Sequence, residues 1–161
     1  MIRYSIPAAL LLLLGACAET GGTGSYGYNN AGPVADTASL AYFNQSLNPT
    51  VLFPVDESAL TPQARDQLAE QARWLTQNSE FTAVIEGHAD EQGTREYNLA
   101  LGARRAAAVQ EYLVSQGVAA SRLRTVTYGK ERPLEICSEE ACYARNRRAV
   151  TAVSAPEGAG V

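Results

Sequence analysis

Two charged side chains of opposite sign, Asp90 and Arg105, stand at positions that suit binding chemistry. At about 100° per residue along a helix, Leu101, Arg105 and Val109 fall on one stripe, whereas Arg104 points towards water. An unpaired buried charge costs several kcal/mol, so Arg105 must either meet an anion or extend to the surface. A guanidinium binds a carboxylate through two hydrogen bonds, and Asp90 can hold a cation. Together they would suit a zwitterion such as an amino acid.

The position of Asp90 supports this interpretation without requiring it. Asp90 lies in the loop Gly87–Thr94, between a β-rich segment and a helix. Ligands of open α/β sheets gather beyond the carboxyl ends of the strands, and a helix N-terminus offers free N–H groups to an anion. Two simpler alternatives stay open. Asp90 pairs directly with Arg105 without a ligand, or Arg105 forms a structural salt bridge at the rim of the core.

The sequence offers little material for catalysis or for a metal centre. His88 is the only histidine, and neither metal-ligand spacing nor a nucleophile elbow accompanies it. We therefore predict that His88 makes a hydrogen bond that stabilises its loop. Asp90 and Glu91 are adjacent, so they do not face one bond from opposite sides as in a glycan hydrolase. We expect no enzymatic activity, no cofactor and no metal. Cys137 and Cys142 predict a disulfide in an oxidising compartment, with a zinc half-site as the alternative.

Alternating strand and helix patterns must position these residues. Strands are predicted over 50–53, 81–86, 121–128 and 148–153, and helices from Thr61-Pro62 to about residue 77, over 95–115 and over 139–147. Thr61 suits an N-cap and Pro62 a first helical position, while Gly117 is typical of a helix end. The order β-α-β-α-β-α-β predicts the α/β class, as a sandwich with helices packed on a mixed four-stranded sheet.

The N-terminal residues predict an export signal. Arg3 precedes the apolar run 6–14, which is shorter than the about 20 residues of a membrane span. The run ends in Leu14-Gly15-Ala16-Cys17, which resembles a bacterial lipobox. This resemblance implies that residues 1–16 are a signal peptide and that Cys17 is lipidated.

Composition then sets the domain plan. The chain has 161 residues, 46% hydrophobic and 19% charged, with a formal net charge of −4, which argues against a nucleic-acid binder. We predict a lipidated, flexible tether over 17–49, one folded domain over 50–153 and a disordered tail over 154–161. Ala18 stands where inner-membrane retention commonly needs Asp, so we expect the outer membrane, facing the periplasm.

Three ordered motifs carry a family resemblance. They are Gly87-His88-Ala89-Asp90-Glu91-Gln92-Gly93-Thr94-Arg95-Glu96-Tyr97-Asn98-Leu99-Ala100-Leu101-Gly102 followed by Arg104-Arg105-Ala106, then Tyr128-Gly129-Lys130-Glu131-Arg132-Pro133, and Asn146-Arg147-Arg148-Ala149-Val150. Over about residues 51–153 the chain resembles the OmpA-like peptidoglycan-binding domain family. The lipobox and the tether resemble its lipid-anchored, peptidoglycan-associated branch.

The resemblance implies noncovalent binding of the peptidoglycan stem peptide through diaminopimelate. By motif position, Asp90 holds the ammonium of the ligand and Arg105 its free carboxylate. The other implied pocket residues are Leu101, Val55, Asp56, Gly93 and Thr94. Gln92 replaces a common Arg and Val55 an aromatic residue, so we expect the same ligand with altered affinity. One of Arg147 and Arg148 is expected to fix the short helix on the sheet through an ion pair.

The implied partners are TolB and the C-terminal region of TolA, in a system that couples envelope constriction to cell division. Two alternatives stay open. One is a wall-binding lipoprotein without Tol partners, and the other is an envelope scaffold that binds only protein.

Overall fold

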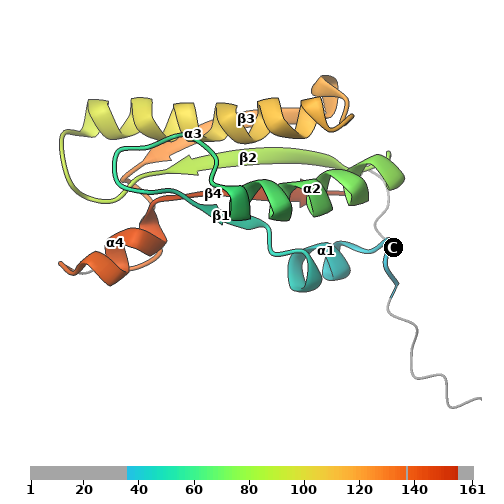
Figure 1. Ribbon diagram of the computed structural model, residues 1–161, viewed down its shortest axis with the longest axis horizontal. Helices are drawn as coiled ribbons and strands as arrows, with labels where there is room; N and C mark the ends of the chain where they lie inside the picture. Colours follow the sequence, from blue (N-terminus) through green and yellow to red (C-terminus); the bar gives the residue numbers. More distant parts are fainter. Residues whose placement is uncertain (1–35, 137, 156–161) are drawn as a thin grey trace, which may run out of the picture. The chain divides into compact units, whose positions relative to one another are not determined.

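The computed structural model describes residues 36–136 and 138–155 (Figure 1). The predicted signal peptide, Cys17 and residues 156–161 lie outside this part. The elements in chain order are α1 (Leu40–Ser46), β1 (Thr50–Leu52), α2 (Pro62–Gln77), β2 (Thr82–His88), α3 (Arg95–Ser115), the 3-10 turn η1 (Ala120–Arg122), β3 (Leu123–Gly129), α4 (Glu140–Asn146) and β4 (Arg148–Ser154). No helix among them is long and apolar enough to cross a membrane.

The four strands form one mixed sheet in the order β1-β4-β2-β3. β4 runs antiparallel to both of its neighbours, β1 and β2, whereas β2 and β3 are parallel. The predicted α/β class, with helices on a mixed four-stranded sheet, is confirmed. The parallel pair requires a crossover, which α3 provides, and this places the start of α3 beside the carboxyl end of β2.

Helix boundaries follow the capping residues. The hydroxyl of Thr61 accepts a hydrogen bond from the N–H of Ala64 at 3.1 Å, and that of Thr94 accepts one from Tyr97 at 3.2 Å. Each hydroxyl satisfies one of the N–H groups that a helix start leaves unpaired. Gly117 follows α3 with a φ of 99°, a conformation that favours glycine.

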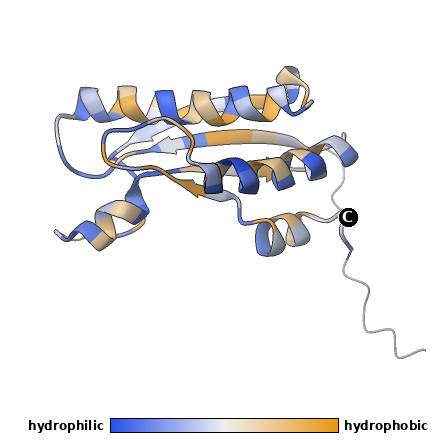
Figure 2. Ribbon diagram, in the orientation of Figure 1, coloured by the Kyte–Doolittle hydropathy of each residue, from blue (hydrophilic) through white to orange (hydrophobic). Residues whose placement is uncertain are grey.

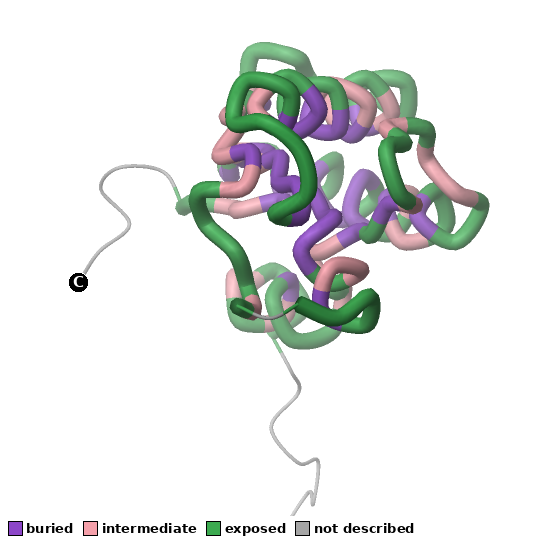
Figure 3. The backbone as a smooth tube through the Cα atoms, turned by 90° about the vertical axis from the view of Figure 1, so that its left-hand side faces the viewer, coloured by how far each residue is buried: buried purple, intermediate pink, exposed green. Residues whose placement is uncertain are grey.

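One hydrophobic core lies between the sheet and its helices. Apolar stripes of α2 and α3, including Leu68, Leu75 and Val109, face Ala83 and Ile85 of β2. Figure 2 shows the alternation of hydrophobic and hydrophilic residues along both helices, and Figure 3 shows that the buried backbone runs through the middle of the molecule. This burial supplies most of the folding free energy.

Two glycines let α3 approach β2 closely. A Cβ atom on Gly87 would lie 1.9 Å from the carbonyl oxygen of Gly102. Only glycine fits at this crossing, because any side chain there would force the helix away from the strand. The approach matters for function, since Arg105 follows Gly102 by less than one helical turn.

Helix α1 corrects the predicted tether over 17–49. Its Phe43 is fully buried and packs on Trp74 of α2, with ring centroids 4.9 Å apart. Trp74 also donates from Nε1 to the carbonyl oxygen of Thr37 at 2.6 Å. The folded domain therefore begins before residue 50. Ser39 caps this seven-residue helix, but a helix that short shows no clear period in the sequence.

We predict that Phe43→Ala destabilises the domain by about 3 kcal/mol, because deleting a buried aromatic ring leaves a cavity against Trp74. Urea unfolding of the full chain, followed by circular dichroism, measures the loss. Asn44→Ala, at an exposed position of the same helix, is the control. Equal midpoints for the two variants would contradict the assignment of α1 to the folded domain.

Candidate functional site

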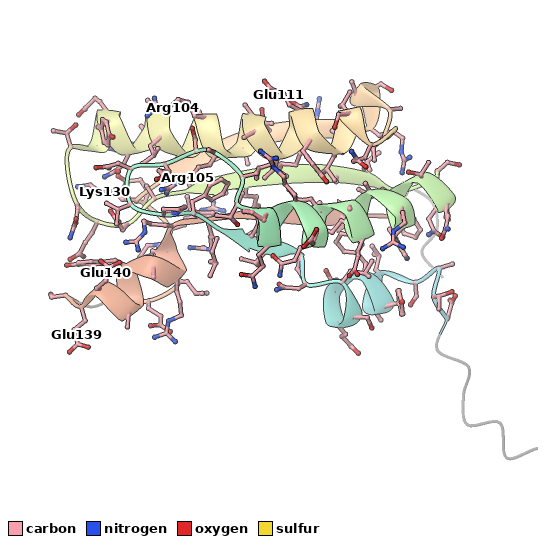
Figure 4. The ribbon with its side chains drawn as sticks, in the orientation of Figure 1. Arg104, Arg105, Glu111, Lys130, Glu139 and Glu140 are labelled. Carbon is pink, nitrogen blue, oxygen red and sulfur yellow. The ribbon has the colours of Figure 1, made fainter. Side chains whose placement is uncertain are left out.

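Arg105 occupies the interior beneath the loop that follows β1. The residue has no exposed surface, and its guanidinium donates to the carbonyl oxygens of Glu57, His88 and Pro54 at 2.8, 2.9 and 3.0 Å. Its Cζ atom lies 5.2 Å from the ring centroid of Phe53. Figure 4 shows the contrast with Arg104, which points away from the sheet. The inward position predicted for Arg105 is confirmed.

Burial lowers the pKa of this guanidinium. Desolvation lowers the pKa of Arg105 to about 10, although the nearby carboxylate of Asp90 acts in the opposite direction. Arg105 remains protonated at neutral pH, and carbonyl dipoles stabilise it in place of water. Three of the five N–H groups of its guanidinium donate to these carbonyls, which leaves two for another acceptor.

The loop over Arg105 carries backbone strain. Asp56 has a φ of 57°, a left-handed conformation that costs a non-glycine residue about 1 kcal/mol. The hydroxyl of Tyr97 donates to Oδ1 of Asp56 at 3.3 Å, so the first turn of α3 helps to hold the loop. Val55 is exposed beside Asp56. Strain of this kind gathers at ligand-binding loops.

Asp90 pairs with Arg147. Oδ2 of Asp90 accepts a hydrogen bond from Nη1 of Arg147 at 3.1 Å, and Oδ1 accepts one from the N–H of Gln92 at 3.1 Å. Arg147 also forms an ion pair with Glu140 of α4 and donates to the carbonyl oxygen of Phe53. Burial lowers the pKa of Arg147, but hydrogen bonds to Glu140 and Asp90 outweigh this and raise it. The predicted ion pair that fixes the short helix is thus Arg147–Glu140.

Asp90 and Arg105 form no direct ion pair, and Arg105 has no salt bridge to any residue in the part of the chain that the structure describes. The guanidinium of Arg105 donates to backbone carbonyl oxygens, and Asp90 forms its ion pair with Arg147. Both groups nevertheless lie at one end of the sheet, near enough for Asp90 to influence the pKa of Arg105. Sequence reasoning missed Arg147 as the partner of Asp90, although the pair Arg147-Arg148 had already stood out.

The remaining predicted residues line the start of α3. Thr94 uses its hydroxyl as the helix cap, Gly93 has a φ of 87°, and Leu101 is buried below them. Lys130 fastens the same loop, because its Nζ donates to the carbonyl oxygen of Gly93 at 2.7 Å. On the other side, the hydroxyl of Tyr143 donates to Glu91 at 2.8 Å, which raises the pKa of Tyr143.

The prediction for His88 is wrong. Its ring is buried, and neither ring nitrogen has a hydrogen-bond partner. Burial, reinforced by the charges of Arg148 and Arg132, lowers its pKa to about 4. The backbone carbonyl of His88 is the group that serves the loop, since it accepts a hydrogen bond from Arg105.

Other features lie away from this site. Cys142 is disulfide-bonded, and its predicted partner Cys137 lies outside the described residues. Hollows of about 540 Å³ beside α1 and about 330 Å³ beside β1 are lined by neither Asp90 nor Arg105. Among residues 36–136 and 138–155, no group of three His, Cys, Asp or Glu side chains has the geometry of a metal site.

Comparison with known proteins shows which family the chain resembles. The model of the OmpA family matches residues 52–147. A peptidoglycan-associated lipoprotein of Mesorhizobium japonicum is 46% identical over 96% of this chain and 92% of its own length, and that of Pseudomonas aeruginosa is 40% identical over 92% and 96%. The crystal structure of the Burkholderia pseudomallei peptidoglycan-associated lipoprotein covers 66% of this chain and 90% of its own, with 37% identity and a TM-score of 0.65.

The chain therefore belongs to the OmpA family. Within it, the relatives that match nearly the whole chain are peptidoglycan-associated lipoproteins, a class of binding proteins without enzymatic activity. A C-terminal domain of Helicobacter pylori MotB, with 18% identity, a TM-score of 0.63 and coverage of 67% of this chain and 85% of its own, shares the fold alone.

The buried histidine generates a pH prediction. The unfolded chain takes up a proton near pH 6.5, but folded His88 does so only near pH 4, so the folded state binds fewer protons between these values. Stability therefore falls by roughly 3 kcal/mol as the pH drops from 6.5 to 4. Urea unfolding measured across this window checks the loss.

His88→Phe is the matched variant, because it fills the same space without a titrating group. Since His88 is the only histidine of the chain, the difference in slope between the two proteins belongs to it alone. Parallel stability curves would contradict the prediction.

Proposed function

We propose that this protein is a lipoprotein that binds peptidoglycan noncovalently through diaminopimelate and links the outer membrane to the cell wall. The observation that carries the proposal is the gathering of an acidic and a basic side chain, Asp90 and Arg105, under two loops at one end of the sheet. The matching relatives bear the name peptidoglycan-associated lipoprotein, which supports the same conclusion.

The chemistry of the ligand fits these residues. The free end of diaminopimelate in a stem peptide carries an ammonium and a carboxylate on one carbon. Asp90 receives the ammonium and Arg105 the carboxylate, with Asp56 and Thr94 as polar neighbours. Val55, Leu101 and Gly93 complete the pocket. Asp90 is already oriented by Arg147 and the N–H of Gln92, so little is lost in ordering it on binding.

Access to Arg105 requires the 54–57 loop to move. The carbonyl oxygens of Pro54 and Glu57 occupy the guanidinium in this structure. A ligand carboxylate replaces them with a stronger, charge-assisted pair of hydrogen bonds. The left-handed backbone of Asp56 would favour this release if the shift allowed the residue to leave that strained conformation.

We further propose the cellular setting. The lipobox at Cys17 supports a lipid anchor in the outer membrane that faces the periplasm, where two or three acyl chains hold stably. TolB and TolA are the proposed partners in a Tol-Pal system for envelope integrity and cell division. Family resemblance alone supports this partnership.

We predict that Asp90→Asn weakens the affinity of the protein for purified sacculi, measured by co-sedimentation, at least about tenfold, because the ligand ammonium loses its counter-charge. Arg104→Gln, an exposed change on α3, should leave it unaltered. A muropeptide whose stem peptide contains meso-diaminopimelate should compete, whereas one that contains lysine, whose free side-chain end carries an ammonium but no carboxylate, should not.

The competition experiment needs no variant and so does not depend on folding. Equal competition by the lysine and the diaminopimelate muropeptides would overturn the ligand assignment. Retention of TolB by the wild-type protein would support the Tol-linked function, and failure to retain it would support a wall-binding lipoprotein without Tol partners. Loss of all binding to sacculi would favour a protein-only scaffold.

A further inference from the structure

The sheet has a second face, opposite α2 and α3. Strand alternation and register place mostly apolar residues there, together with three charged ones: Leu52, Val84, Glu86, Arg124, Val126, Tyr128, Arg148, Val150 and Ala152. We call this set the open face. All of its apolar members keep part of their surface exposed, whereas Ala83, Ile85 and Ala149 on the helix-covered face are buried.

A poorly satisfied cation lies at one end of the open face. Arg148 is 8% exposed, yet with the described residues its guanidinium makes only two long hydrogen bonds, to the carbonyl oxygens of Asn146 at 3.5 Å and Arg132 at 3.3 Å. Among the described residues, no carboxylate lies within 4.0 Å of it. Arg105 and Arg147, by contrast, each make three hydrogen bonds.

The surroundings of Arg148 add donors and positive charge. Arg132 lies over the ring of Tyr128, with its Cζ atom 3.8 Å from the centroid. The ring of His88, which has no hydrogen-bond partner, lies 5.4 Å from that of Tyr128. The carboxylate of Glu86 lies 3.8 Å from the His88 ring. Its negative charge raises the pKa of Arg148, but burial has the larger effect and lowers it. Glu86 does not pair with Arg148, so the guanidinium has no carboxylate partner among the described residues.

We propose that the open face is a docking surface for a protein partner whose acidic side chain, set among apolar residues, forms an ion pair with Arg148. The apolar neighbours of that side chain pack on the valines of β2, β3 and β4. This surface uses other side chains than the proposed wall site, because none of the residues of the open face is among those proposed to contact diaminopimelate.

Charge and surface chemistry favour a protein over the other large anions of the envelope. One guanidinium accepts one carboxylate through two hydrogen bonds, which fits a single Asp or Glu side chain. The chain carries a net charge of −4, which opposes a polyanionic lipid surface. A strip of valines suits apolar side chains and offers few hydrogen-bonding groups to the hydroxyls of a glycan.

Selection from a displayed library of random twelve-residue peptides against the full chain tests the proposal. We expect the enriched peptides that contact the open face to share one Asp or Glu flanked by apolar residues. Replacing that acid by its amide should weaken binding at least about tenfold. Arg148→Gln should remove the difference between acid and amide peptides, whereas Arg124→Gln, an exposed arginine on the same face, should keep it.

The acid-to-amide comparison on the wild-type chain needs no variant, so it holds even where Arg148→Gln folds poorly. Enriched peptides without a common acid, or with equal affinity for wild type and Arg148→Gln, would overturn the proposal. Displacement of the peptides by anionic phospholipid vesicles or by sacculi would also overturn it, and would assign the face to lipid or wall.

Discussion

Arg105 enters the interior from the middle of α3 and brings a full positive charge with it. Removing that charge from water costs more than the protein can spare unless oxygen atoms replace the solvent. Carbonyl groups of residues 54, 57 and 88 provide this replacement, and they come from the loop after β1 and from the end of β2, where the next loop starts. The charge thus dictates the conformation of both loops, and through them the positions of Asp56 and Asp90.

A second guanidinium extends the same arrangement. Arg147 joins the end of β1, the loop after β2 and helix α4 through Phe53, Asp90 and Glu140. Its removal would leave two carboxylates, those of Asp90 and Glu140, without their counter-charge, and the carbonyl oxygen of Phe53 without its donor. Arg105 in turn depends on the glycine contact between β2 and α3, which brings the helix close enough for this side chain to reach the end of the strand.

Much of the fold was predictable from local signals. The 95–115 helix has the predicted bounds, because its cap, its apolar period and Gly117 all act within the segment. Helix α1 was not predictable, since its stability comes from Phe43 packing on Trp74, a contact that local sequence does not encode. The inward turn of Arg105 followed from the period of α3. The pairing of Asp90 with Arg147 spans 57 positions and needs the sheet register.

The connection of α1 to the rest of the domain has a mechanical consequence. Thr37 is fastened to Trp74 near the end of the sheet where β2 begins, while Asp90 follows the opposite end of β2. Figure 1 shows the loop before α3 at the left end of the strands and α1 below their right-hand part. Tension between residue 37 and Asp90 therefore acts along the strand direction. The backbone hydrogen bonds between β2 and β4 would then be loaded in shear, so that they bear the force together and do not break one after another.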